Sequence, residues 1–446
     1  MQSKFGGIKM LKCIFQQSRN FLKSNTPEEQ VLFVLIKMLP EISKKKLGVS
    51  AAFVIDTSGS MSENDNSGKR KIDTVVDSFH KLIDSSILDE NNKLSLIKFS
   101  DYSEVVMPLT DISDKEKIHK VIEKIRIIEG GTLMGKGMKN AYDELKKLNS
   151  PQPKRVILLT DGETFDEEDC IKEAGRLSEI NAPILSIGVG VTYNQELLLR
   201  ISDMTRGKHL HLQNPDELEK FFLDELKISK REVITNLKAF IEFSKGVRIE
   251  SIHKVYPNIT NIENTNPYTF GNIQVGDYTI FLLKLVISGL SRPNGKTRIL
   301  QAKIYGDIPE KNASEFLFGT YEVFVEFSNR EENWRIVDQE VLDYVAQLNV
   351  GYLIGEANKL TNIGDISGAT KKLEEAMRIT QRLGNSALTE NLSKAINEVA
   401  KTHMLSEESK RTLVANSRTK TIKSQRTLSI ENLGISEEDI RKISGT

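Results

Sequence analysis

The sequence predicts an α/β domain inserted into an antiparallel β-sandwich and followed by a small α-helical segment. In the first half, strand-length apolar runs alternate with stretches of 3.6-residue apolar period. This pattern is typical of a doubly wound, mostly parallel sheet with helices on both faces. Further along, apolar and polar residues alternate singly, as in antiparallel strands. Helical periodicity then returns toward the C-terminus.

Length and composition restrict the class of protein. A chain of 446 residues exceeds the size at which one hydrophobic core keeps growing, so several domains are expected. Basic and acidic residues number 62 each, which speaks against nucleic acid or a membrane surface as the main partner. No apolar run approaches the roughly 18 residues of a membrane-spanning helix. The first residues have no sustained apolar stretch and no small-residue cleavage site, so we do not expect export. With only two cysteines, we expect a cytoplasmic protein without disulfides.

The first segment, residues 1–48, contains two strand-like runs at 10–16 and 30–39. Two strands cannot form a core of their own, so we expect them to join the sandwich. The α/β domain spans 49–228. Its strand candidates are Ala51–Asp56, Leu94–Phe99, Val105–Leu109, Arg155–Asp161, Ile184–Gly190 and His209–Leu212. The short step between Phe99 and Val105 indicates one antiparallel edge strand.

The remaining chain divides into three parts. Residues 229–330 contain alternating strands separated by Asn, Gly and Pro clusters, which predicts the sandwich. Residues 331–404 have helical spacing interrupted at Gly364 and Gly384, which predicts three helices. Residues 405–446 lack a periodic core, and we expect a flexible, basic, Ser/Thr-rich tail.

Polar residues gather where three strands or helices of the α/β domain begin or end. Asp56, Ser58 and Ser60 follow the first strand, Thr132 precedes a helix, and Asp161 ends another strand. In open α/β sheets, ligands bind at the carboxyl ends of the strands. Two carboxylates and three hydroxyls form an all-oxygen donor set suited to a hard divalent cation. The sequence therefore predicts a metal site on these loops.

The segment FVIDTSGSM resembles the D-x-S-x-S signature of the von Willebrand factor type A (VWA) domain with its metal-ion-dependent adhesion site. Asp56, Ser58 and Ser60 match the first loop of that site, Thr132 the second and Asp161 the third. The resemblance covers about residues 49–228, and the order of segments resembles stand-alone cytosolic microbial members. It implies Mg²⁺ (or Mn²⁺) held by hydroxyls, with the aspartates acting mainly through water, and a partner protein that presents an acidic side chain.

Two other motif matches are rejected. Residues Gly130–Lys136 have the spacing of a phosphate-binding loop, but Gly137 stands where a Ser or Thr must hold Mg²⁺. Asp56-Thr57-Ser58-Gly59 resembles an aspartic protease motif, but no second matching segment supplies the partner aspartate.

An enzyme that forms an aspartyl-phosphate on Asp56 is the alternative, with Asp161 as a Mg²⁺ ligand. Soluble enzymes of this kind usually carry a general acid two residues after the nucleophile, where this chain has Ser58. We therefore expect a binding protein and not an enzyme. A scaffold that needs no metal is the third possibility.

Two further features carry weaker hypotheses. His209 and His211 fall on one face of a strand and could bind a transition metal, although strand alternation alone explains them better. In the tail, basic residues flank Thr419, Thr421 and Thr427, which suits a Ser/Thr kinase and a phosphothreonine-binding partner. We thus expect a metal-dependent adaptor that takes part in phosphorylation-linked signalling.

Overall fold

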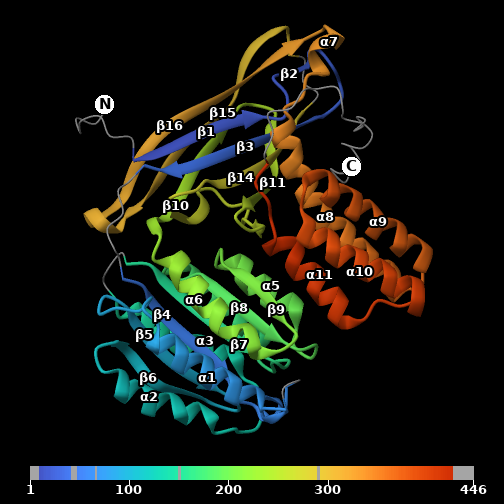
Figure 1. Ribbon diagram of the computed structural model, residues 1–446. Helices are drawn as coiled ribbons and strands as arrows, with labels where there is room; N and C mark the ends of the chain where they lie inside the picture. The colour runs from blue at the N-terminus through green and yellow to red at the C-terminus, as the bar shows by residue number, and fades with distance from the viewer. Residues whose placement is uncertain (1–9, 42–47, 66–67, 149–151, 289–291, 425–446) are drawn as a thin grey trace.

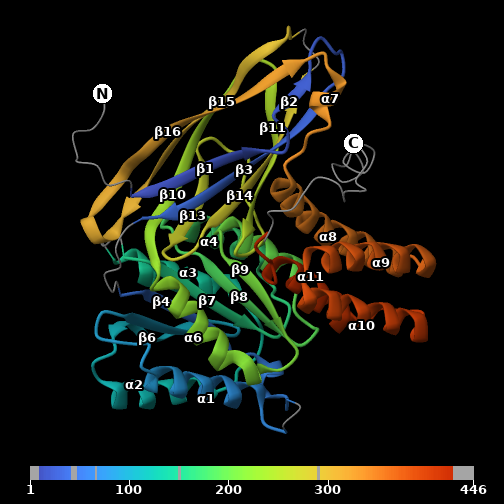
Figure 2. The same cartoon turned by 45° about the horizontal axis from the view of Figure 1, so that its top comes forward.

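A computed structural model describes residues 10–41, 48–65, 68–148, 152–288 and 292–424. The sandwich lies at one end of the molecule and the α/β domain at the other (Figure 1). The last four helices lie beside both, as a second view also shows (Figure 2). The predicted fold class is confirmed.

The α/β domain is built on a six-stranded sheet in the order β6-β5-β4-β7-β8-β9. β6 pairs antiparallel with β5, as predicted, and the other neighbours are parallel. The central strands β4 and β7 are almost wholly buried because helices cover both faces. The strands are β4 (Ser50–Asp56), β5 (Lys93–Phe99), β6 (Ser103–Asp111), β7 (Lys154–Thr160), β8 (Ile184–Val189) and β9 (Lys208–Leu212).

Each face of this sheet has its own hydrophobic core. On one face Phe53 packs against Phe79 and Phe222, with ring centroids 4.8 and 5.3 Å away. This face is covered by α1 (Lys71–Asp84), α2 (Lys115–Ile122) and α6 (Leu218–Ser229). The opposite face is covered by α3 (Met134–Lys146), α4 (Glu167–Glu179) and α5 (Gln195–Met204).

The sandwich consists of two five-stranded sheets, β1-β3-β14-β11-β12 and β13-β10-β15-β16-β2. β3 pairs along its length with β14, from Gln30 opposite Ile287 to Met38 opposite Thr279. The α/β domain is therefore inserted between β3 and β10. The strands are β1 (Leu11–Gln17), β2 (Phe21–Lys23), β3 (Gln30–Pro40), β10 (Glu232–Phe243), β11 (Val247–Tyr256), β12 (Thr260–Asn261), β13 (Tyr268–Gln274), β14 (Thr279–Ile287), β15 (Gly295–Ile308) and β16 (Ala313–Ser328).

The described C-terminal region contains two helices more than the sequence predicted, the short α7 (Glu331–Trp334) and α11 (Glu407–Thr419). Between them come α8 (Gln339–Asn362), α9 (Ile366–Leu383) and α10 (Ser386–Thr402). The prediction of a flexible tail was wrong for α11. Ser406 caps this helix by accepting from the Ser409 amide at 3.2 Å, and Leu413, Ala415 and Ser417 are buried. No helix in the described ranges is long and apolar enough to cross a membrane.

Candidate metal-binding site

Three loops meet at the carboxyl edge of the central strands. Asp56 ends β4, and the 3₁₀ turn Gly59–Ser62 follows it directly. Asp161 follows β7, which is the parallel neighbour of β4, so both aspartates lie at the same edge of the sheet. Thr132 lies just before α3. The structure thus brings together the loops on which the five predicted residues lie.

Hydroxyl and carboxylate oxygens from these loops are in direct contact. The Ser60 hydroxyl donates to Asp161 Oδ1 at 2.6 Å, and the Ser58 and Ser60 hydroxyls are 3.2 Å apart. A Cβ atom at Gly162 would lie 3.7 Å from Ser60 Oγ and 4.0 Å from Thr132 Oγ. The oxygens of Ser58, Ser60, Thr132 and Asp161 therefore surround one small space beside Gly162. This donor set fits a hard divalent cation.

Asp56 lies beneath these residues and is fully buried. Its Oδ1 accepts from the Ser58 amide at 2.8 Å and its Oδ2 from the Thr160 hydroxyl at 2.6 Å. Burial, with a smaller contribution from the charge of Asp161, raises the pKa of Asp56 to about 6. Its hydrogen bonds oppose this rise. The Asp56 carboxylate thus fixes the first loop and places a negative charge where a cation would be favourable.

Lys71, in the first turn of α1, is a site residue that the sequence analysis missed. Its amine lies 2.8 Å from Asp161 Oδ2 and 2.8 Å from Glu63 Oε2. Burial lowers the pKa of Lys71, but the hydrogen bonds to Asp161 and Glu63 outweigh burial and raise it overall. The charged amine of Lys71 therefore contacts the second carboxylate oxygen of Asp161. The sequence feature that could have indicated this residue is a lysine at the first position of the helix that follows the D-x-S-x-S loop.

The second and third loops are held together by Thr164 and Asp166. The Thr164 hydroxyl lies 3.0 Å from the Thr132 carbonyl and 2.6 Å from Asp166 Oδ1. Asp166 in turn accepts from the amides of Gly135 and Lys136, at 3.1 and 3.3 Å. The N-terminus of α3 is thus bonded to a carboxylate of the chain itself, which agrees with the rejection of a phosphate-binding loop.

The strand histidines belong to a buried network and form no metal site. His209 Nδ1 lies 2.9 Å from the Ser186 hydroxyl, and burial lowers its pKa to about 3. His211 lies 2.9 Å from the Tyr193 hydroxyl and 3.0 Å from Glu408 of α11. Within the part of the chain that the structure describes, no group of three His, Cys, Asp or Glu residues is arranged to hold a metal ion.

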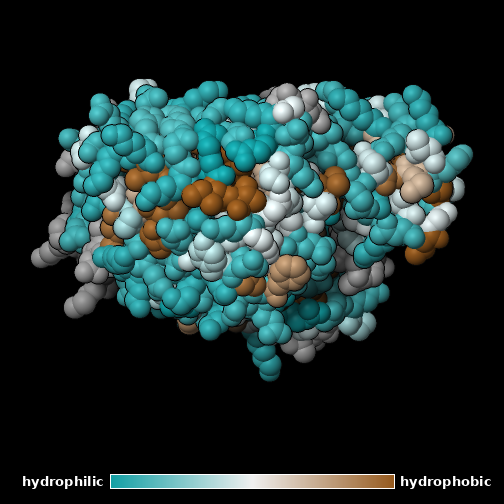
Figure 3. Space-filling model, turned by 90° about the horizontal axis from the view of Figure 1, so that it is seen from below, coloured by the Kyte–Doolittle hydropathy of each residue, from teal (hydrophilic) through white to brown (hydrophobic). Residues whose placement is uncertain are grey.

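Exposed hydrophobic side chains flank the metal-site loops. Phe165 is 82% exposed, and its amide donates to the Thr132 carbonyl at 3.0 Å. Val191 is 42% exposed, and the neighbouring Thr192 donates its hydroxyl to the Asp161 carbonyl. Seen from below, the surface is largely hydrophilic, with one broader hydrophobic patch left of centre and smaller hydrophobic groups elsewhere (Figure 3). Phe165 and Val191 are therefore well placed to contact a ligand bound at the loops.

Two of the three predicted phosphorylation positions are in ordered, partly buried surroundings. The Thr419 hydroxyl donates to the Ala415 carbonyl at 2.9 Å, and that of Thr421 donates to the Pro257 carbonyl at 2.6 Å. Thr427 lies outside the described residues. Modification of Thr419 or Thr421 would require local detachment of this segment.

Comparison with known proteins matches two parts of the chain, the α/β domain and the C-terminal helices. Residues 52–224 match the von Willebrand factor type A domain, and residues 339–423 match the Sll0103-like C-terminal alpha-helical domain. The uncharacterized protein sll0103 of Synechocystis is 24% identical over 344 residues, which is 75% of this chain and 79% of that protein. The uncharacterized protein YfbK of Escherichia coli is 25% identical over 55% of this chain, which covers 43% of that protein.

Two solved structures share the whole arrangement. A von Willebrand factor type A protein from Catenulispora acidiphila has a TM-score of 0.77 at 17% identity, over 94% of this chain and 99% of that one. The ArnB paralog VWA2 from Sulfolobus acidocaldarius has a TM-score of 0.61 at 16% identity, over 93% and 100% of the two chains. At these identities the likeness establishes the fold alone.

Proposed function

We propose that this protein, which carries a von Willebrand factor type A domain followed by a C-terminal helical domain, binds an acidic side chain of a partner protein through a divalent metal ion. The observation that carries the proposal is the meeting of three loops around one space, with Ser60 Oγ 2.6 Å from Asp161 Oδ1. VWA domains bind a divalent metal at these loops. Mg²⁺ or Mn²⁺ is the ion we expect.

The roles follow from the donors. Ser58, Ser60 and Thr132 would supply neutral oxygens, whereas Asp56 and Asp161 would supply negative charge and hold water. Two carboxylates balance a divalent ion without saturating it, so the ion retains affinity for a carboxylate from outside. That carboxylate would complete the coordination and tie the partner to the α/β domain.

Selectivity would come from the surface around the metal. One metal–carboxylate contact offers little discrimination, because most interface energy resides in a few well-packed anchors. Phe165 and Val191 would contact apolar groups beside the partner's acidic residue. Residues 62–65 and 68–69, together with the segment Glu163–Glu168, would add polar contacts. We thus expect a ligand with a Glu or Asp flanked by apolar residues.

The test is titration of the purified chain with Mg²⁺ and Mn²⁺ by calorimetry, followed by partner capture from lysate with and without chelator. Ser58→Ala/Ser60→Ala should reduce metal affinity at least about tenfold, because two hydroxyl donors are lost. Ser113→Ala, which removes an exposed hydroxyl outside the site, should change nothing. Equal metal binding by both variants, or the same partners in chelator, would contradict the proposal and favour the metal-independent scaffold.

The enzymatic alternative is less well supported by the site. The Asp56 side chain is fully buried, and each of its oxygens accepts a hydrogen bond, from Ser58 and from Thr160. A phosphate donor, which is much larger than a water molecule, therefore has poor access to it. We therefore propose a non-enzymatic role. An acid-stable phosphoprotein formed with a phosphate donor, and lost in Asp56→Asn, would revive the enzyme.

Phosphorylation-linked signalling in the cytoplasm is the finer part of the proposal. A phosphate on Thr421 would remove the hydrogen bond to Pro257 and release the end of the C-terminal region from the sandwich. Intact-mass analysis of protein from its native host should detect phosphate on a peptide containing Thr419, Thr421 or Thr427. Its absence under all growth conditions would remove this part and leave metal-dependent binding untouched.

A further inference from the structure

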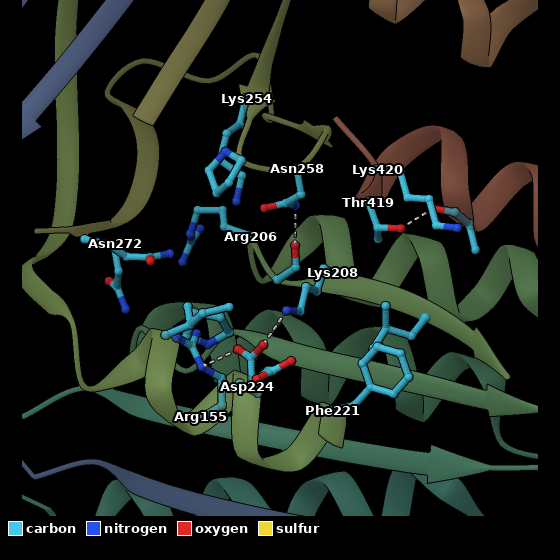
Figure 4. A pocket seen from close by; sticks show the side chains of 18 of the residues that line it. Arg155, Arg206, Lys208, Phe221, Asp224, Lys254, Asn258, Asn272, Thr419 and Lys420 are labelled. Atoms are coloured by element: carbon cyan, nitrogen blue, oxygen red, sulfur yellow. Dashed lines mark hydrogen bonds and ion pairs between the residues drawn. The ribbon is translucent and has the colours of Figure 1, made fainter. Parts of the chain in front are cut away.

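A cavity of about 540 Å³ is lined by residues at the starts of β7, β8 and β9, which is the end of the sheet away from the metal-site loops. Its walls come from the α/β domain, the sandwich and helix α11 (Figure 4). The α/β domain contributes β9 and α6, the sandwich contributes β11 and β13, and α11 contributes its last turn. Its size is within the range of small-molecule sites.

Basic side chains dominate the inner wall of the cavity. Arg155, Lys208, Arg206 and Lys254 line it, together with the buried carboxylates Glu225 and Glu232. Four cations against two anions leave an excess of two positive charges among these six residues, which the other charged lining residues reduce to one. The other charged lining residues are the exposed Glu217 and Lys420, and Asp224, which pairs with Lys227 at 3.5 Å.

Two of these cations already have carboxylate partners. Arg155 forms an ion pair with Glu225 at 3.0 Å and another with Glu232. Lys208 pairs with the other oxygen of Glu225 at 2.7 Å. The buried anions are thereby committed to Arg155 and Lys208. They leave little negative charge for the two remaining cations.

Within the described ranges, no carboxylate forms an ion pair with Lys254 or Arg206. Only more distant negative charges act on them, those of Glu232 and Glu225 on Lys254 and that of Glu263 on Arg206. Among the described residues no hydrogen bond or ion pair engages the Lys254 amine. Burial, then the charges of Arg155 and Lys208, lowers its pKa to about 8. Arg206 donates to Ser178, but its Nε is buried without an acceptor. An anion placed between Lys254 and Arg206 would pair with the Lys254 amine and accept a hydrogen bond from Arg206 Nε.

The outer wall is different in character. Phe221, Leu210 and Ile228 provide an apolar surface on the α6 and β9 side. In Figure 4, Lys254 and Arg206 lie on the sandwich side of the cavity and Phe221 lies on the other side. We propose that the cavity binds a small organic phosphate, with the phosphate group between Lys254, Arg206 and Lys208 and its apolar part against Phe221.

The experiment uses the full chain, calorimetry, and two probes, inorganic phosphate and phenyl phosphate, with phenol as the uncharged analogue. Phenyl phosphate should bind more tightly than inorganic phosphate, and phenol should not bind. Lys254→Met should weaken both phosphates by at least about tenfold, because a charge-assisted contact in a desolvated site is lost. Lys401→Met, on the exposed face of α10, should bind both as the wild type does.

The Phe221→Ala variant tests the apolar contact separately from the phosphate contact. It should remove most of the advantage of phenyl phosphate while leaving inorganic phosphate unchanged. Thermal unfolding of Lys254→Met without ligand should be at or above the wild-type temperature, because an unpaired buried charge is removed, so a loss of binding there is not a loss of fold. Absence of phosphate binding to the wild type, or equal binding by Lys254→Met, would overturn the proposal.

Discussion

The two ends of strand β7 both hold buried charge, but the charge is compensated in different ways. At the start of β7, Arg155 joins Glu225 of α6 and Glu232 of β10. At its end, Asp161 and the neighbouring Asp56 face hydroxyls and a single lysine. The first end fastens the α/β domain to the sandwich. The second end is the candidate metal site.

The pKa values of three buried carboxylates follow the number of cations that each contacts. Glu225 has two, Arg155 and Lys208, and its pKa is lowered despite burial. Glu232 has Arg155 alone, and burial raises its pKa. Asp56 has none, and burial raises its pKa to about 6. A carboxylate that the protein does not neutralise is the one that can gain most from a metal ion.

The largest effect on stability is expected from removing Arg155, at the start of β7, where the buried charges are paired. Arg155→Met leaves Glu225 and Glu232 buried with less positive charge, so we expect the free energy of unfolding to fall by about 3–5 kcal/mol. Urea denaturation measures it. Arg298→Met, which breaks the exposed pair with Glu322, is the control and should cost less than about 1 kcal/mol. Similar losses of unfolding free energy in the two variants would show that the Arg155 ion pairs do not hold the α/β domain to the sandwich.

The next effect concerns His209 on β9, a buried base without a counter-charge. Its folded pKa of about 3 lies below the unfolded value near 6.5. The unfolded chain therefore takes up a proton as pH falls below about 6.5 while the folded chain does not, and stability declines by up to about 1.4 kcal/mol per pH unit. The His209→Gln variant should show a shallower decline between pH 6.5 and 5. Parallel curves would show that His209 is not responsible.

At the metal-site end of the sheet, the Asp56→Asn variant should lower metal affinity while changing the stability of the fold little. The amide retains the size of the carboxylate and removes its buried charge, but its NH2 group cannot accept one of the two hydrogen bonds that the carboxylate accepts. The two effects oppose each other, so we expect the unfolding free energy to change by less than about 1 kcal/mol. Metal affinity should nevertheless fall at least about tenfold. Calorimetry with Mn²⁺ and urea denaturation of the same sample give both values. A large loss of stability with unchanged metal affinity would mean that Asp56 stabilises the fold and does not contribute to metal binding.

The smallest effect should be a gain. Lys71→Met removes a cation beside Asp161 and frees its Oδ2, so metal affinity should rise about threefold from reduced charge repulsion. Lys139→Met, which breaks an exposed pair with Asp143 on α3, should leave affinity unchanged. A fall in metal affinity in Lys71→Met would mean that the lysine positions Asp161 and does not compete with the metal.

Sequence reasoning succeeded where the determinants are local. Asp56, Ser58 and Ser60 lie within five residues after one strand. Thr132 and Asp161, although Asp161 is 101 residues from Ser60, stand at recognisable helix and strand edges, so the meeting of these loops could be predicted. Lys71 and Arg155 have no comparable local signature, because a basic residue in a helix or strand does not indicate which carboxylate it pairs with, here 90 and 77 residues away. Helix α11 was missed because only Leu413, Ala415 and Ser417 are buried, too few for a clear apolar period. Strand β2 has three residues, which is shorter than any pattern.

The insertion of the α/β domain between β3 and β10 has a mechanical consequence. The chain enters β4 at Ser50 and leaves after α6 at Ser229, both at the end of the sheet that faces the sandwich. The metal-site loops lie at the other end. Tension applied to a partner held there would run lengthwise through β4 and β7 and divide between two covalent connections and the Arg155 ion pairs. A domain attached in this way resists being peeled from its support, because no single strand bears the whole pull.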